Sequence, residues 1–228
     1  MQPRRYAAIA SVALLSTSLF AGAWLDRSRT ATVLEAGVRF SPISGTFEHP
    51  RRNFRLRGVQ ALDPVDAARI YDLVGGTLAH GYARSGDPAA QAYRGWKRYN
   101  TAPFPSKTHG NRYLNIYANR TARRYGKLAR AGTLAVGSIV AADSFSLVAS
   151  GEIVLGPLFI MEKMPEGFNE ASGDWRYGYI QPDGKPFGKT KGAHAARVAY
   201  CISCHLAVEK QDHLYFPPKR YRETQRNE

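Results

Sequence analysis

Two cysteines and a histidine near the C-terminus have the spacing that covalent haem attachment requires. The segment reads Cys201-Ile202-Ser203-Cys204-His205, and the chain has no other cysteine. Two thiols three positions apart reach both vinyl groups of one haem from a single helical turn, and the histidine that follows then ligates the iron. The pattern predicts one covalent haem c, held by Cys201 and Cys204, with His205 as the proximal iron ligand.

Three other uses of a cysteine pair fit the pattern less well. A disulfide that spans two residues inside a helix is strained. A redox pair is expected near a βαβ unit, usually without the trailing histidine. A zinc site needs two further ligands at suitable spacing, and the sequence holds no second cysteine pair.

The N-terminus predicts export. Arg4 and Arg5 precede an apolar run over 6–24, in which Ala21-Gly22-Ala23 provides a small-residue cleavage signal. This is the pattern of a signal peptide over 1–23. An uncleaved membrane anchor stays open as the alternative, because the run just reaches the roughly 17–25 residues that span a bilayer. In both cases the arginines keep the body outside, so the expected location is the periplasm, either free or anchored to the inner membrane.

The chain is strongly basic, with 32 lysines and arginines against 18 acidic residues and a formal charge of +14. Loss of Arg4 and Arg5 with the signal peptide leaves +12. Such a surface attracts acidic proteins, anionic lipid or nucleic acid. Export argues against nucleic acid. An acidic redox partner and a membrane surface therefore stay open, beside a basic surface that is merely solvated.

Composition and periodicity divide the chain into five parts. Residues 1–23 form the signal peptide, and 24–62 form an extended arm with a basic run at its end. A helical segment at 63–100 begins at Pro64, with Asp63 as N-cap, and holds helices to about Tyr82 and over 89–99. A haem domain at 101–220 and a charged tail at 221–228 complete the chain.

Within 101–220, alternating apolar residues predict strands and a helical pattern predicts two helices. The expected strands are 113–117, 138–148, 153–164 and 175–180, and the expected helices are 120–131 and the haem helix 191–208. A tight turn at Ser150-Gly151 joins the two long strands as an antiparallel hairpin. The fold class is therefore α+β: a small antiparallel sheet with flanking helices and a C-terminal haem-attachment helix.

A series of short motifs over 107–217 resembles a known family. In order they are His109-Gly110, then Asn119 with Ala122 and Tyr125, then 137–140, 161–164, Gly173-Asp174-Trp175, Pro182-Asp183-Gly184, the haem motif and 212–216. Their order and spacing are similar to those of the cytochrome P-460 and cytochrome c-prime-beta family over about half of the chain. The resemblance implies a haem c in a β-rich pocket, with an open or weakly filled sixth iron position, often in a homodimer.

The family has two branches, and the resemblance separates them by one residue. Members of the P-460 branch oxidise hydroxylamine and carry a lysine cross-linked to the haem ring. The c-prime-beta branch lacks the cross-link and binds nitric oxide and related gases. Aligned from Gly137, Ala142 occupies the lysine position, and alanine cannot form the bond. Lys163 on the next strand is a remote substitute, expected to be an exposed sheet lysine.

The distal side of the haem is the least determined part of the site. The candidates for a sixth ligand are His109, Met161, Met164 and Lys163. His194 and His213 are weaker, because His194 is expected on the haem helix itself and His213 follows it closely. Ala142, Phe145 and Phe159 are candidates for an apolar distal wall, whereas Trp175 and Tyr177 are expected in the core.

Three functions follow from these patterns. The first is an exported cytochrome that binds nitric oxide or related nitrogen and oxygen species, or performs redox chemistry at the iron. The second is an enzyme that oxidises hydroxylamine or reduces peroxide. The third is an electron carrier with a six-coordinate iron, in which a methionine or lysine ligand would set the potential.

Overall fold

The computed structural model describes residues 37–40 and 50–223 of the chain. The predictions for the signal peptide at 1–23, for most of the arm before residue 50 and for residues 224–228 of the tail fall outside these residues. Within the described ranges, no helix combines the length and the apolar character that a membrane crossing needs.

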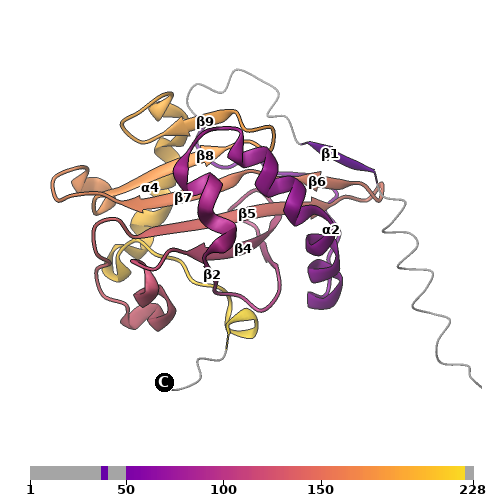
Figure 1. Ribbon diagram of the computed structural model, residues 1–228, viewed down its shortest axis with the longest axis horizontal. Coiled ribbons are helices and arrows are strands. Elements are labelled where there is room, and N and C mark those ends of the chain that lie inside the picture. The colour runs from indigo at the N-terminus through magenta and orange to yellow at the C-terminus, as the bar shows by residue number, and fades with distance from the viewer. Residues whose placement is uncertain (1–36, 41–49, 224–228) are drawn as a thin grey trace, which may run out of the picture. The chain divides into compact units, whose positions relative to one another are not determined.

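One sheet with helices on both sides confirms the predicted α+β class (Figure 1). The part of the chain that the structure describes contributes nine strands to the sheet, several of them only two or three residues long. The strands are β1 Val38–Phe40, β2 Lys97–Arg98, β3 Phe104–Ser106, β4 Arg112–Ala118, β5 Ile139–Leu147, β6 Ile153–Leu155, β7 Leu158–Lys163, β8 Trp175–Ile180 and β9 Pro186–Lys189.

The helices of the described residues are short, apart from one of 20 residues. The α-helices in these ranges are α2 Pro64–Ala83, α3 Pro88–Ala92 and α4 Ala199–His205. Short 3-10 helices occupy Tyr93–Gly95, Arg123–Arg130, Glu170–Ser172, Ala195–Val198, Leu206–Gln211 and Lys219–Tyr221.

Strand β5 lies at the centre of the sheet. It pairs with β4 along one edge, and with β7 and β6 in succession along the other. The predicted hairpin after β5 is confirmed, but its second strand is divided into β6 and β7 at Gly156-Pro157. Beyond β7 the sheet continues through β8 to β9, and β1 adds a parallel strand beside β6.

The two faces of this sheet have different neighbours, because side chains alternate along a strand. On β5, Ala142 lies opposite Phe159 of β7 and belongs to the face that packs against α4. The next residue, Asp143, and Phe145 point to the other face, where both contact Tyr71 of α2. Figure 1 shows α2 in front of the strands and α4 behind them.

Helix α2 begins as the sequence predicts. The Asp63 carboxylate accepts hydrogen bonds from the backbone N–H groups of Val65 and Asp66, both at 2.9 Å, and Pro64 occupies the first turn. The buried residues of α2 recur at helical spacing, so they form one side of the helix, which packs against the sheet. Near its end, the Tyr82 hydroxyl donates to the Gly156 carbonyl at 2.7 Å, beside the break between β6 and β7.

Two predicted helices before the haem motif are wrong in type or length. The helix expected over 89–99 ends at Ala92, because the chain then buries Tyr93 against the sheet and forms β2, which pairs with β4. The helix expected over 120–131 is a 3-10 helix with a break at Leu128, whose φ is 55°. Asn119 uses its side-chain oxygen on both Ala122 and Ile139, at 2.9 and 3.1 Å, and so ties this segment to β5.

The haem helix is also shorter than the predicted 191–208. Lys191 and His194 both have a φ of 53°, in the left-handed region, which a continuous α-helix cannot include. The α-helical part, α4, therefore holds only the residues around the two cysteines, with a 3-10 turn on each side.

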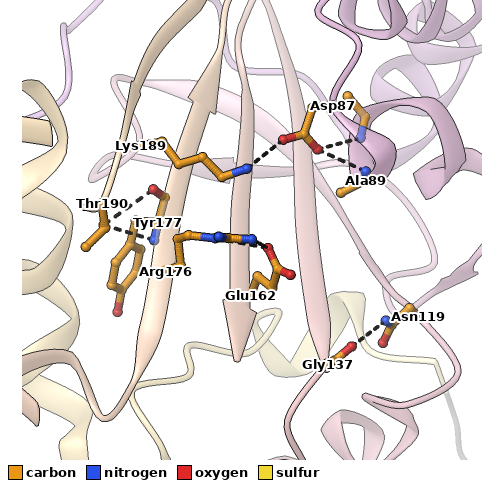
Figure 2. Close-up of polar contacts among 10 residues, drawn as sticks. Asp87, Ala89, Asn119, Gly137, Glu162, Arg176, Tyr177, Lys189 and Thr190 are labelled. Atoms are coloured by element: carbon orange, nitrogen blue, oxygen red, sulfur yellow. Dashed lines mark hydrogen bonds and ion pairs between the residues drawn. The ribbon is translucent and has the colours of Figure 1, made fainter. Parts of the chain in front are cut away.

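Polar contacts tie the outer strands to the helices (Figure 2). Lys189 of β9 reaches the Asp87 carboxylate at 3.0 Å, and the same carboxylate caps α3 by accepting from the backbone N–H of Ala89 at 2.9 Å. Glu162 of β7 pairs with Arg176 of β8 across the strands. These pairs hold the face of the sheet opposite α4.

The described part of the arm lies along the sheet by backbone hydrogen bonds. Leu56 N–H donates to the Gly110 carbonyl at 3.0 Å, and Gln60 N–H donates to that of Leu147 at 2.8 Å. From the body, Arg112 donates to the Phe54 carbonyl at 2.9 Å. The arm thereby covers the loop that carries His109.

Candidate haem site

Helix α4 presents both cysteines on one short helix. Cys201 is half-buried, Cys204 is exposed, and neither forms a disulfide. Burial raises the pKa of the Cys201 thiol to about 12, so this thiol is protonated at neutral pH. Cys201 and Ile202 pack against the same apolar cluster as the sheet residues Ala142, Phe159 and Met161.

His205 is held in one orientation by the segment that follows it. Its Nδ1 lies 2.7 Å from the backbone carbonyl of His213. The ring packs against both Tyr177 and Tyr215, with centroid distances of 5.1 and 5.2 Å. Burial lowers the pKa of His205, which favours the neutral ring. Because a carbonyl only accepts, Nδ1 carries the proton and Nε2 is the basic nitrogen.

The sheet supplies an aromatic and apolar wall to the site. Phe159 lies opposite Tyr179 in the register of β7 and β8, and Met161 lies opposite Tyr177. The ring of Phe159 packs edge-on against Tyr179, with a centroid distance of 5.2 Å. Ala142 is the smallest side chain of this wall, so it leaves the most room there.

His109 comes to the site from the loop before β4. Its ring lies 4.8 Å from that of Phe159, and its Nδ1 is 2.9 Å from the hydroxyl oxygen of Ser106. Burial lowers the pKa of His109 to about 3, and the charges of His205 and then Arg112 act in the same direction. His109 is therefore a neutral imidazole near His205.

Three expectations about individual residues are wrong. Phe145 does not line this wall, because it lies on the opposite face and stacks on Tyr113, with a centroid distance of 5.7 Å. Lys163 is not an exposed sheet lysine: it is 7% exposed and pairs with Asp212 at 2.6 Å. His194 is exposed and precedes α4, so the expectation that it lies on the haem helix is wrong.

Several residues that contact His205 were not singled out for that role. Tyr177 was expected only in the core, yet its ring packs on the imidazole and its buried hydroxyl has no hydrogen-bond partner among the described residues. Tyr215 packs edge-on against the imidazole and donates to the Cys204 carbonyl at 3.1 Å. In the sequence, Tyr215 is marked only by its place in the motif at 212–216.

The donor set fits a covalently held haem. Two unpaired thiols lie three positions apart on one helical turn, and the next side chain is a neutral imidazole whose Nε2 is the basic nitrogen. In such a site Cys201 and Cys204 would hold the ring and His205 would hold the iron.

Comparison with known proteins adds one finding to this geometry. The sequence profile described as Cytochrome P460 matches residues 90–216. No curated protein matches the chain. The profile match covers more than half of the sequence, including His109, Ala142 and the haem motif, and it begins within the predicted helical segment 63–100. The chain therefore belongs to the cytochrome P460 family, and membership of this family implies a haem cofactor.

Proposed function

We propose that this protein is a mono-haem c-type cytochrome that binds nitric oxide or related small ligands, or exchanges electrons, without a lysine–haem cross-link. The observation that carries the proposal is His205, a neutral imidazole fixed through Nδ1 beside two free thiols, with its ring packed on Tyr177 of the wall that contains Ala142. When bound, the haem supplies an iron that can hold one further small ligand or change its charge by one electron.

The lysines near the site support the absence of a cross-link. Strand β5, where the family lysine would lie, contains no lysine, and Ala142 occupies the aligned position. Lys163 is the nearest alternative on the same face, but its Nζ already donates to Asp212 at 2.6 Å and to the Gly173 carbonyl at 2.7 Å. A bond from Lys163 to a haem ring would require both contacts to break.

His109 is the residue best placed to act on a bound small ligand. It is neutral, and its Nδ1 contact with Ser106 fixes the ring beside Phe159. The second candidate function, a six-coordinate electron carrier, is favoured by the same observation, because a neutral imidazole is a good iron ligand. The enzyme alternative, with hydroxylamine or peroxide as substrate, has no specific residue in its favour.

Optical spectra of the purified ferric and ferrous protein test these functions. An open iron gives high-spin spectra and binds nitric oxide, whereas ligation by His109 gives low-spin spectra that become high-spin in His109→Leu. Low-spin spectra unchanged in His109→Leu would remove the small-ligand proposal and move the search for a sixth ligand to Met161. Acid-acetone extraction that frees the haem would refute covalent attachment.

The absence of a cross-link has its own test. A tryptic haem peptide should contain only the segment around Cys201 and Cys204, and turnover of hydroxylamine should be weak or absent. A haem peptide that also carries Lys163 would refute the absence of a cross-link and favour the enzyme alternative.

We also propose that an acidic redox protein docks at a basic cleft beside α4. A cleft of about 1950 Å³ lies between residues 50–62 and the sheet, and Tyr200, the neighbour of Cys201, lines it. No acidic residue is among its described lining residues, whereas the basic ones are Arg51, Arg52, Arg55, Arg57, Lys107, Arg112 and Arg220. Complementary charge of this kind steers an acidic partner to the site. A periplasmic location and a homodimer are further proposals, which rest on the predicted signal peptide and on the family.

A further inference from the structure

A buried ion pair lies next to the turn that contacts His205. Lys163, the last residue of β7, and Asp212 are both buried, with 2.6 Å between Nζ and Oδ1. Lys163 also donates to the Gly173 carbonyl at 2.7 Å, and its Nζ lies 5.2 Å from the centre of the Trp175 ring.

Asp212 is fixed by more than this ion pair. Its second carboxylate oxygen accepts from the backbone N–H of Leu134 at 2.8 Å. Its backbone carbonyl accepts from the Trp175 indole N–H at 2.9 Å. A carboxylate and a carbonyl held at three points fix both the position and the rotation of this residue.

These contacts hold an unusual turn. Asp212 and His213 have φ values of 57° and 59°, so two successive residues other than glycine adopt the left-handed conformation. Such residues persist only where the surrounding contacts hold them there. Gly173 closes the turn from the other side, because a Cβ at that position would lie 2.6 Å from His213 Cδ2.

The turn presents the carbonyl that orients His205. The His213 carbonyl accepts from His205 Nδ1 at 2.7 Å, and its direction follows from the left-handed conformation at Asp212 and His213. A hydrogen bond from the outer nitrogen of a ligating histidine fixes the ring and makes the other nitrogen a stronger donor to the metal. The ion pair thus acts on the ligand through the turn.

We propose that the Lys163–Asp212 ion pair is a positioning device for the proximal ligand: it holds the turn whose carbonyl bonds His205 Nδ1, and it thereby sets the reduction potential of the iron. The proposal rests on the proposed function, in which His205 ligates a covalent haem. Lys163 and Asp212 are positioning residues, because they act on His205 through the turn.

The midpoint potential distinguishes this role from a simple effect of charge. Loosening the turn weakens the donor strength of His205, and the oxidised iron is then less stabilised. Lys163→Met and Asp212→Asn should therefore both raise the potential, by about tenfold in the equilibrium constant, or about 59 mV for one electron. An effect of charge alone would lower the potential in Lys163→Met and raise it in Asp212→Asn.

Glu162→Gln is the matched control. Glu162 precedes Lys163 on β7, points to the opposite face and pairs with Arg176, and its change removes one negative charge just as Asp212→Asn does. Its potential should stay at the wild-type value. In the ferrous protein, the iron–histidine stretching frequency should fall in Lys163→Met and Asp212→Asn and stay constant in the control.

A double variant keeps the test decisive if either single variant fails to fold. Lys163→Met/Asp212→Asn leaves no unpaired buried charge, so it should recover stability while the potential stays raised. A potential that stays at the wild-type value in this folded double variant, with covalent haem and His205 ligation intact, overturns the inference and leaves the proposed function standing. If instead His205→Ala leaves the Soret band unchanged in a covalent haem protein, the proposed function fails on its own.

Discussion

Replacing Asp143 by asparagine should change how the stability of the protein depends on pH. Asp143 lies on β5, fully buried beneath α2, and accepts hydrogen bonds from Tyr71, from Tyr93 at 3.1 Å and from Asn115 at 3.2 Å. Burial raises the pKa of this carboxyl from 3.8 to about 6, and the three hydrogen bonds offset part of that effect. Arg94 donates to the Tyr71 hydroxyl rather than to the carboxylate.

The sign follows from which state binds the proton more tightly. Because the pKa is higher in the folded protein, that state holds more protons than the unfolded chain between pH 3.8 and about 6. Stability from this group is therefore present at low pH and is lost as the pH rises through this window. The full effect is about 3 kcal/mol, of which about 2 kcal/mol falls between pH 4 and pH 7.

The assay is urea unfolding of the holoprotein, followed by far-ultraviolet circular dichroism at intervals from pH 4 to pH 7. The wild type should lose about 2 kcal/mol more of its unfolding free energy over this range than Asp143→Asn loses. Any constant difference between the two proteins cancels in this comparison, as do the other titrating groups. Parallel curves would refute the reasoning, and an opposite slope would show that the hydrogen bonds from the tyrosines outweigh burial.

Three further predictions concern the haem site and the arm. Gly173→Ala should destabilise the protein by about 2 kcal/mol in urea unfolding, because the new Cβ meets the His213 ring. Gly137→Ala, also at positive φ but with open space around it, should destabilise it by only about 1 kcal/mol. Equal losses of stability would argue against the close contact at Gly173. Cys201→Ser and Cys204→Ser should each lose one thioether, seen as an altered pyridine haemochrome band, and a spectrum unchanged from the wild type in either variant would exclude that cysteine. Changing Arg51, Arg52, Arg55 and Arg57 to glutamine should weaken the binding of poly-L-glutamate and reduce the salt dependence of that binding. The matched control is the same change at Arg123, Arg124, Lys127 and Arg130, which do not line the cleft and should have a smaller effect. An equal effect of both sets would mean that only net charge matters.

Local signals in the sequence were sufficient where the structure depends on neighbours along the chain. Asp63 and Pro64 mark the start of α2, because capping is a local contact. Strand β8 lies over the predicted 175–180, because the alternation of apolar residues that indicates a strand is also local. The haem motif itself is a local pattern. The family profile match confirms the family that the motif order indicated.

The errors concern contacts between distant segments. Alternation along β5 places Ala142 and Phe145 on opposite faces, but only the helices that cover those faces determine which one meets α4. Lys163 follows a polar glutamate at the end of a strand, so nothing local indicates that Asp212, far along the chain, makes its burial possible. Similarly, Lys191 and His194 have the left-handed conformation that shortens the haem helix, but neither is a glycine, so the sequence does not indicate it.

The position of α4 after the last strand has a consequence for how the chain folds. Synthesis runs from the N-terminus, so the strands β2 to β9 are complete before Cys201 is made. Until α4 and the residues around Phe216 arrive, the wall that holds Phe159 and Met161 lacks the cover that they provide. Exposed apolar surface of this kind makes unfinished chains prone to aggregate. We therefore expect a chain that ends before α4 to aggregate, whereas the complete chain covers this wall with α4 and the residues around Phe216.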